Sequence, residues 1–188
     1  MRIFLLLMSL LLLNVACVTQ PQRISGNSDA RTASELQHWQ ASGRIGISSE
    51  QQSGSAGFNW LQQDALSQVQ VRGPVGVGSL SLTLDAAVLM IQASDGTAYA
   101  ADAALSEMQL RLGASLPVGQ LRYWLLGMAA PGEHHWLNAD NTLLEQDGWQ
   151  IAYAEWSQRE QLRLPVRLVL TRDSVRILVV IQSWNVGL

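Results

Sequence analysis

The stretch ALSQVQVRGPVGVGSLSLTLD, residues 65–85, decides how this chain folds. Residues 66–72 alternate apolar and polar side chains, and residues 80–84 repeat that alternation with three leucines. Period-two alternation on both sides of a Gly/Pro cluster predicts two antiparallel strands joined by a connection. Each strand then has one apolar face, so we expect a ribbon that is buried on one side only.

The connection itself, residues 73–78 (GPVGVG), is unusual because turn tips are normally polar. It carries Val75 and Val77, while its three glycines permit unusual backbone angles and Pro74 stiffens its start. Two interpretations remain open at this point. The loop folds back onto its own core, or it projects as an apolar tip that contacts an apolar surface.

Bulk composition limits the class of protein. The 188 residues are 48% apolar and 14% charged, which suits one domain plus a removable leader. The twelve basic residues are all arginine and form no basic run, so we expect no nucleic-acid partner.

The N-terminus has the pattern of an export signal. Arg2 precedes an apolar run, residues 3–13, that is too short to span a bilayer comfortably. The segment ends at Ala16-Cys17, which resembles the lipobox of bacterial lipoproteins, although Asn14 stands where Leu is usual. The alternative is a plain secretory signal with a chance cysteine, which would leave Cys17 an unpaired thiol.

These features divide the chain into three parts. We expect a lipoprotein signal peptide at residues 1–16, the lipidated Cys17 with a polar tether to residue 28, and a single domain at residues 29–188. Three acyl chains exceed the two hydrophobic signals that stable anchoring needs. Because Val18, not Asp, follows the cysteine, sorting rules favour an outer-membrane anchor with the domain facing the periplasm.

The rest of the chain predicts a strand meander interrupted by helices. A helix is expected from residue 29 to Trp39, followed by strands at 41–48, 56–63, 87–93 and 97–100 besides the two already described. Residues 102–112 and 117–126 change to helical spacing, and Gly127 fits the end of the second helix. Strands resume at 143–144, 149–154, 164–171 and 175–183; the last is apolar on both faces, so we expect it to be covered on both sides.

Residue patterns of catalysis and metal binding are weak. His134 and His135 are adjacent and would point apart on an extended chain, so we expect no metal site. The glycines of residues 73–78 lie between two strands, whereas a dinucleotide-binding loop needs a strand followed by a helix. Asp102 and Glu107 are interpreted as solvated helix charges. We therefore expect no cofactor and no enzymatic activity.

An apolar interior remains as the functional feature. A curved antiparallel sheet with helices over one end can enclose a cavity larger than its own side chains fill. Such a cavity suits acyl chains, since each methylene removed from water contributes about 0.8 kcal/mol. A triacylated lipoprotein cannot cross the periplasm unshielded, so a protein that receives it must offer comparable apolar shelter.

Several motifs together resemble the LolB family, the outer-membrane lipoprotein receptors of Gram-negative bacteria. Besides Cys17 they run in family order from about Trp39 to the C-terminus, and each is weak alone. They are Gly43-Arg44-Ile45, Phe58-Asn59-Trp60, Gly73-Pro74-Val75-Gly76, Leu121-Arg122-Tyr123-Trp124-Leu125-Leu126-Gly127, Gly148-Trp149-Gln150-Ile151-Ala152-Tyr153, Leu164-Pro165-Val166-Arg167-Leu168 and Trp184.

This resemblance implies a fold and a role. The fold is mainly β with α, an unclosed antiparallel β-barrel with a helical lid over an apolar cavity. The role is to accept mature triacylated lipoproteins from the soluble periplasmic carrier LolA and to insert them into outer-membrane phospholipid without covalent chemistry. The family's projecting loop carries an apolar residue, usually Leu, that is needed for delivery. Val75 matches it here, flanked by Pro74 and Gly76, and Val77 can share the task.

The apolar faces of the predicted elements supply the expected cavity lining, and we expect a monomer. The lining residues predicted from the sequence are Ile45, Ile47, Phe58, Trp60, Leu80, Leu82, Met108, Leu121 and Leu125. Two other hypotheses stay open. A structural or assembly lipoprotein that binds another envelope protein would have a filled core and an indifferent loop. A lipid hydrolase would need Ser, His and a carboxylate together at a pocket.

Overall fold

The computed structural model describes residues 33–50, 53–73, 78–85, 88–112, 116–159 and 161–187, without the side chains of residues 108 and 110–112. The predicted signal peptide, Cys17 and the tether lie outside the described residues. So do the loop residues Pro74, Val75, Gly76 and Val77.

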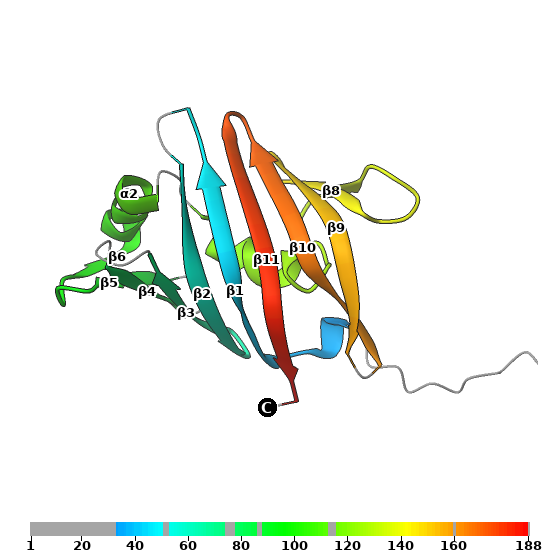
Figure 1. Cartoon of the computed structure of the whole chain (residues 1–188), viewed down its shortest axis with the longest axis horizontal. Helices are drawn as coiled ribbons and strands as arrows, with labels where there is room; N and C mark the ends of the chain where they lie inside the picture. The colour runs from blue at the N-terminus through cyan, green and yellow to red at the C-terminus, as the bar shows by residue number, and fades with distance from the viewer. Residues whose placement is uncertain are drawn as a thin grey trace, which may run out of the picture.

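One sheet of eleven strands makes up most of the described chain (Figure 1). The strands are β1 (His38–Ser48), β2 (Ser53–Gln63), β3 (Leu66–Arg72), β4 (Ser79–Asp85), β5 (Val88–Ala93), β6 (Ala98–Ala100), β7 (His135–Trp136), β8 (Leu143–Gln146), β9 (Trp149–Arg159), β10 (Leu162–Arg172) and β11 (Val175–Val186). A short 3-10 turn, η1 (Ala33–Glu35), precedes them, and the helices α2 (Ala101–Leu112) and α3 (Val118–Trp124) interrupt them.

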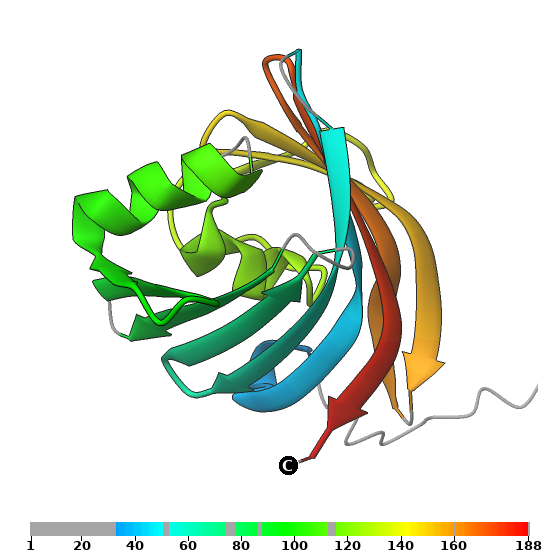
Figure 2. The same cartoon turned by 60° about the vertical axis from the view of Figure 1, so that its left-hand side comes forward.

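The strand order is β6-β5-β4-β3-β2-β1-β11-β10-β9-β8-β7, and every neighbouring pair is antiparallel. The chain therefore forms two meanders. The first meander is β1–β6 and the second is β7–β11, and they meet where β1 pairs with β11. β6 and β7 end the sheet, so the barrel is not closed, and both helices lie in the connection between these two edges. Figure 2 shows the sheet curving around α3, with α2 beside β5 and β6. This confirms the predicted fold class.

Alternation positions the core as the sequence predicted. On β3 and β4 the apolar side chains Val69, Val71, Leu80 and Leu82 are buried, and Val71 pairs directly with Leu80. The polar residues between them are exposed or half-buried. The strands predicted at the C-terminus are also present and extend further than expected.

The predicted helix from residue 29 to Trp39 is wrong within the described residues. Only η1 is helical, and Trp39 is the second residue of β1. Its ring contacts Trp60 with centroids 5.8 Å apart and Trp184 with centroids 5.4 Å apart, and it is only 1% exposed. Burial of a large aromatic ring in the sheet overrides the local helical spacing.

Two further expectations need correction, and one short strand was not expected. Leu178 and Val180 of β11 are half-buried on the convex face, where Figure 1 shows strands toward the viewer and the helical segment α3 behind them. The last strand is therefore not covered on both sides by the described elements. Glu107 is buried, not solvated, and shares a side of α2 with the buried Ala104 three residues earlier. The two-residue strand β7 has too little periodicity to be predicted.

Gly43 explains a motif that sequence alone left unexplained. It lies at a shift in the register between β1 and β11, where the two backbones approach closely. A Cβ atom at this position would overlap the carbonyl oxygen of Val180, which is a backbone atom and cannot rotate away. The close approach therefore requires glycine.

Gly43→Ala is expected to lower the free energy of unfolding by about 3 kcal/mol, since overpacking against backbone forces the strands apart. Gly54→Ala is the matched control, because a Cβ at Gly54 meets nothing within 4 Å in the adjacent strand β2. Chemical denaturation of both variants measures the difference. Equal stability of the two variants would contradict the close approach.

Candidate functional site

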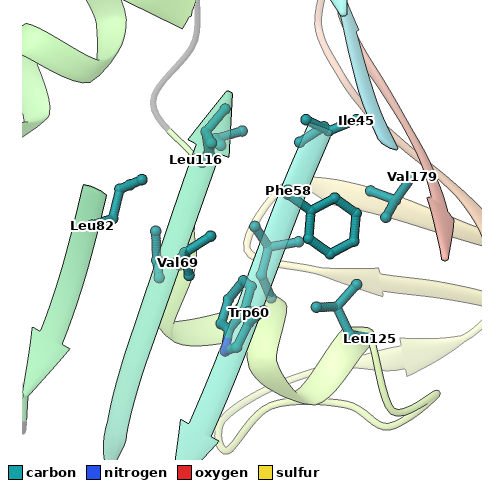
Figure 3. Close-up of a pocket in the computed structure, with 11 residues that line it drawn as sticks. Ile45, Phe58, Trp60, Val69, Leu82, Leu116, Leu125 and Val179 are labelled. Atoms are coloured by element: carbon teal, nitrogen blue, oxygen red, sulfur yellow. The ribbon is translucent and has the colours of Figure 1, made fainter. Parts of the chain in front are cut away.

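An apolar pocket lies between α3 and the concave face of the sheet (Figure 3). Its volume is about 40 Å³, and its accessible lining is entirely apolar. In Figure 3, Phe58 and Trp60 project from β2 into the same space that Leu125 enters from the opposite side. The lining residues are Ile45, Phe58, Trp60, Val69, Val71, Leu82, Leu116, Val118, Leu121, Leu125 and Val179.

The structure brings most of the predicted lining residues together. Six of the nine line this pocket: Ile45, Phe58, Trp60, Leu82, Leu121 and Leu125. Ile47 and Leu80 are buried in the same core without lining it. The side chain of Met108 is not described. Whether these residues shelter acyl chains stays a prediction.

Five lining residues were not predicted. Val69 and Val71 lie on the apolar face of β3, so the alternation that defined the strand was a sufficient signal. Val179 reaches the pocket because it pairs with Ile45, a contact between the last strand and the first that no local pattern reveals. Leu116 and Val118 lie at the start of α3, where position depends on how the helix crosses the sheet.

Trp60 keeps its polar atom away from the apolar lining. Its Nε1–H donates a 3.0 Å hydrogen bond to Oε1 of Gln62, and the hydroxyl of Ser67 donates to the same oxygen at 2.7 Å. The Nε2 of Gln62 donates to the backbone oxygen of Asp64 at 2.8 Å. Because these buried polar groups satisfy one another, the pocket can remain apolar without an unpaired indole N–H.

Gln146 of β8 fastens α3 to the second meander. Its Oε1 accepts hydrogen bonds from Trp124 Nε1 and from the backbone N–H of Ala130, each 2.9 Å long. Its Nε2 donates to the backbone oxygen of Ala130 at 2.8 Å. The side chain is 2% exposed, so these bonds are made out of contact with water.

The C-terminal end of α3 depends on Gly127, as its predicted role at the end of the helix requires. Gly127 has φ +79°, and the backbone N–H of Met128 donates to the oxygen of Tyr123 at 3.1 Å. A Cβ at Gly127 would lie 2.6 Å from the ring of Trp156. Both the left-handed backbone and the close ring contact therefore favour glycine.

A different set of contacts joins α3 to the first meander. Apolar side chains across the pocket make most of it, and Arg122 adds a polar contact on the rim. Its Nη1 donates to the backbone oxygen of Ala65 at 3.3 Å, while Nη2 donates to the hydroxyl of Tyr123 at 2.8 Å. The guanidinium also lies 4.7 Å from the centre of the Tyr123 ring.

The electrostatics of the concave side suit apolar contact. Tyr153 is buried beside Trp136 and Trp156, and burial raises the pKa of its hydroxyl well above the usual range. The phenol therefore stays neutral at physiological pH. His134 precedes β7 and His135 is its first residue; both are exposed and neither lines the pocket, and the described residues hold no group of three His, Cys, Asp or Glu side chains that could bind a metal.

The helices do not provide a membrane span. Among the described residues, neither helix is long and apolar enough to cross a bilayer.

The family described as "Outer membrane lipoprotein LolB" matches residues 37–184, which include every strand that contributes to the pocket. The chain belongs to the LolB family. This confirms the family predicted from the motifs, its general role in outer-membrane lipoprotein sorting and its place among outer-membrane lipoproteins.

Individual LolB proteins are similar over most of their length. The chain is 34% identical to the outer-membrane lipoprotein LolB of Pseudomonas paraeruginosa, covering 98% of this chain and 96% of that protein. It is 37% identical to LolB of Ectopseudomonas mendocina, covering 81% and 76%. Among solved structures, a DUF1329 family protein from Desulfovibrio piger shares the fold with a TM-score of 0.51 at 5% identity, covering 83% of this chain and 88% of the other.

Replacing the buried amide tests how α3 is held. Gln146→Leu is expected to reduce the free energy of unfolding by about 3 kcal/mol, since it leaves the indole of Trp124 and both backbone groups of Ala130 unpaired. Gln150→Leu, at an exposed position on β9, should change it by less than about 0.5 kcal/mol. Urea denaturation of the two variants gives the comparison, and equal effects would contradict a special role for Gln146.

Proposed function

We propose that this LolB-family protein receives the acyl chains of mature lipoproteins from the soluble carrier LolA and releases them into the outer membrane. The transfer is non-covalent, without a cofactor. The pocket between α3 and the sheet is the observation that carries this proposal. It is apolar over its whole lining, which comes from β1–β4 and β11 of the sheet and from the α3 segment.

Burial of methylene groups supplies the driving force. Each methylene that leaves water contributes about 0.8 kcal/mol, so an apolar interior can take cargo from a carrier that shelters the chains less well. The transfer then runs toward the tighter site, and energy from a nucleotide is not required. Phe58 and Val69 from the sheet and Leu121 from α3 provide apolar contact in the pocket.

The pocket must enlarge to accept an acyl chain. Its volume of about 40 Å³ has room for only a few water molecules, since each needs about 10–15 Å³ of such space. We infer that α3 and the first meander separate when cargo enters. That separation breaks apolar contacts and the Arg122–Ala65 hydrogen bond, while the Gln146 bonds on the other side of α3 stay intact.

The N-terminal residues and the 74–77 loop complete the proposal. Residues 1–16 are removed as a signal peptide, Cys17 carries the lipid, and residues 18–28 tether the domain, which acts as a monomer. Delivery depends on the apolar tip at Val75, aided by Val77. The tip enters the phospholipid surface because its valines have a lower free energy in apolar surroundings than in water.

Uptake is tested by moving cargo from loaded LolA to the protein. Phe58→Asn places an amide on the pocket wall, and the cost of burying it should reduce the equilibrium transfer about tenfold. Leu61→Asn is the matched control, because Leu61 is half-buried on the opposite face of β2. Its transfer should equal that of the wild type.

If no cargo moves to the wild type, acyl-chain uptake is refuted and the structural or assembly hypothesis replaces it. If both asparagine variants lose transfer equally, the pocket is not the site of uptake. Co-purification of cargo with the protein distinguishes uptake by this protein from release of the cargo by LolA alone.

Delivery is tested with liposomes. Val75→Glu is expected to take cargo from LolA normally and to lose most of its release into liposomes, since a carboxylate resists entry into apolar surroundings. Val88→Glu is the control, because Val88 is an exposed valine on β5 with 57% exposure. Flotation of the liposomes measures delivered cargo, and unchanged delivery by Val75→Glu would remove the loop from the mechanism.

A further inference from the structure

The antiparallel register aligns three arginines on the convex face. Arg167 of β10 pairs with Val180 of β11, which pairs with Arg44 of β1. Arg44 in turn pairs with Gly57 of β2, and Gly57 pairs with Arg72 of β3. Arg167, Arg44 and Arg72 are here called the arginine row; they occupy every second strand, with backbones about 10 Å apart.

The arginine row lies opposite the pocket. Arg44 precedes Ile45 and Arg72 follows Val71, and both of these apolar neighbours line the pocket. Successive residues of a strand point to opposite faces, so the arginines project from the convex surface. Arg44 and Arg72 are exposed, and the Arg167 side chain is 43% exposed. In Figure 1 this is the face of β2, β1, β11 and β10 toward the viewer.

The surroundings of the row leave its charge largely uncompensated. Glu155 lies 3.9 Å from Nε of Arg167, and both side chains are well exposed, so solvent screens that pair. Arg72 donates to the neutral amide of Gln70 at 3.1 Å. The adjacent rows on the same face are uncharged; they consist of Val169, Leu178, Gly46 and Ser55 on one side and Ser183, Ser42, Asn59, Gln70 and Ser81 on the other.

The arrangement of the arginine row favours one kind of anionic partner. Guanidinium groups bind phosphate through two parallel hydrogen bonds, and a row of three arginines spread over five neighbouring strands can engage more than one phosphate at once. Val180 and Gly57, which alternate with the arginines, have shorter side chains and do not block access to the guanidinium groups. The row therefore matches a surface that presents many separate phosphates, and a membrane-anchored protein is always close to one.

We propose that the arginine row docks the convex face onto anionic phospholipid headgroups of the membrane. This goes beyond the proposed transfer and does not depend on it. Arg72 is the last residue of β3, so the row ends where the chain leaves the sheet. Docking in this orientation turns the pocket side away from the bilayer and leaves it free to meet a soluble carrier.

The test measures which face of the lipidated full-length protein meets the bilayer. Cys17, the predicted lipidation site, is the only cysteine, so an added cysteine can be labelled selectively. A fluorophore at Ser55→Cys reports on the convex face, and one at Asp140→Cys reports on an exposed turn after β7. Quenching by headgroup-labelled lipid is compared in phosphatidylethanolamine vesicles with and without phosphatidylglycerol.

We expect phosphatidylglycerol to increase quenching at position 55 and not at position 140. Each arginine near an anionic surface contributes about fivefold, so changing Arg44, Arg72 and Arg167 to Gln should lower the ratio of docked to undocked protein on the order of 100-fold. The matched control changes Arg159, Arg163 and Arg172 to Gln, which removes the same charge elsewhere and should leave docking intact. Arg44→Gln alone should give about a fivefold loss, and high salt should abolish docking.

Equal quenching in both lipid mixtures would overturn the proposal, as would equal loss in the two triple variants. Normal docking of the row variant combined with lost binding to an acidic soluble carrier would also overturn it, by making the row a protein-binding surface. Because lipoprotein transfer is not part of the measurement, a failure here leaves the proposed transfer to its own test.

Discussion

The pairing of β1 with β11 is the constraint on which the rest of the structure depends. The first and last described strands hold each other in register from Trp39 with Val186 to Ser48 with Arg176. Without this pairing the two meanders would be linked only through the segment that carries the helices. Ile45 and Val179 face each other across it and both line the pocket. The glycine at position 43 permits the register shift that keeps the two strands together.

Local patterns in the sequence predicted the elements well and their long-range contacts less well. Alternation at residues 66–72 and 80–84 placed β3 and β4, and helical spacing placed α2 and α3, because both signals reflect which face each element must bury. The helix predicted through Trp39 failed because the burial of its ring among Trp60 and Trp184 depends on strands distant in sequence. The family resemblance supplied the unclosed barrel, which periodicity alone cannot distinguish from other meanders.

In the candidate site, too, residues with a local sequence signal could be predicted and residues placed by long-range contacts could not. Leu82 could be predicted as lining because its strand alternates clearly, and Phe58 and Trp60 because they lie two residues apart and so share a face of their strand. Val179 could not, since its strand is apolar on both faces and its partner is far away along the chain. Gln146 gave no signal either: a glutamine in a polar-looking hairpin becomes a buried hydrogen-bonding centre only when α3 packs over it.

The two sides of α3 differ in the type of contact. Toward β8 it is held by the buried hydrogen bonds of Gln146, which are directional and costly to break, and by an exposed 3.1 Å hydrogen bond from Gln120 to Asp147. Toward the first meander the contacts are mostly apolar and non-directional, so that in the proposed uptake acyl chains would replace them with contacts of the same kind. The helix is thus expected to stay with the second meander when the pocket opens.

The short strands β6 and β7, which leave the sheet unclosed, have a mechanical consequence. In a closed barrel the number of strands and their stagger set the radius, so the lumen cannot widen unless ladder hydrogen bonds break. An eleven-stranded sheet with two free edges can change its curvature while every strand keeps its neighbours. The open sheet therefore allows the interior volume to change through bending of the strands, without the loss of hydrogen bonds between them.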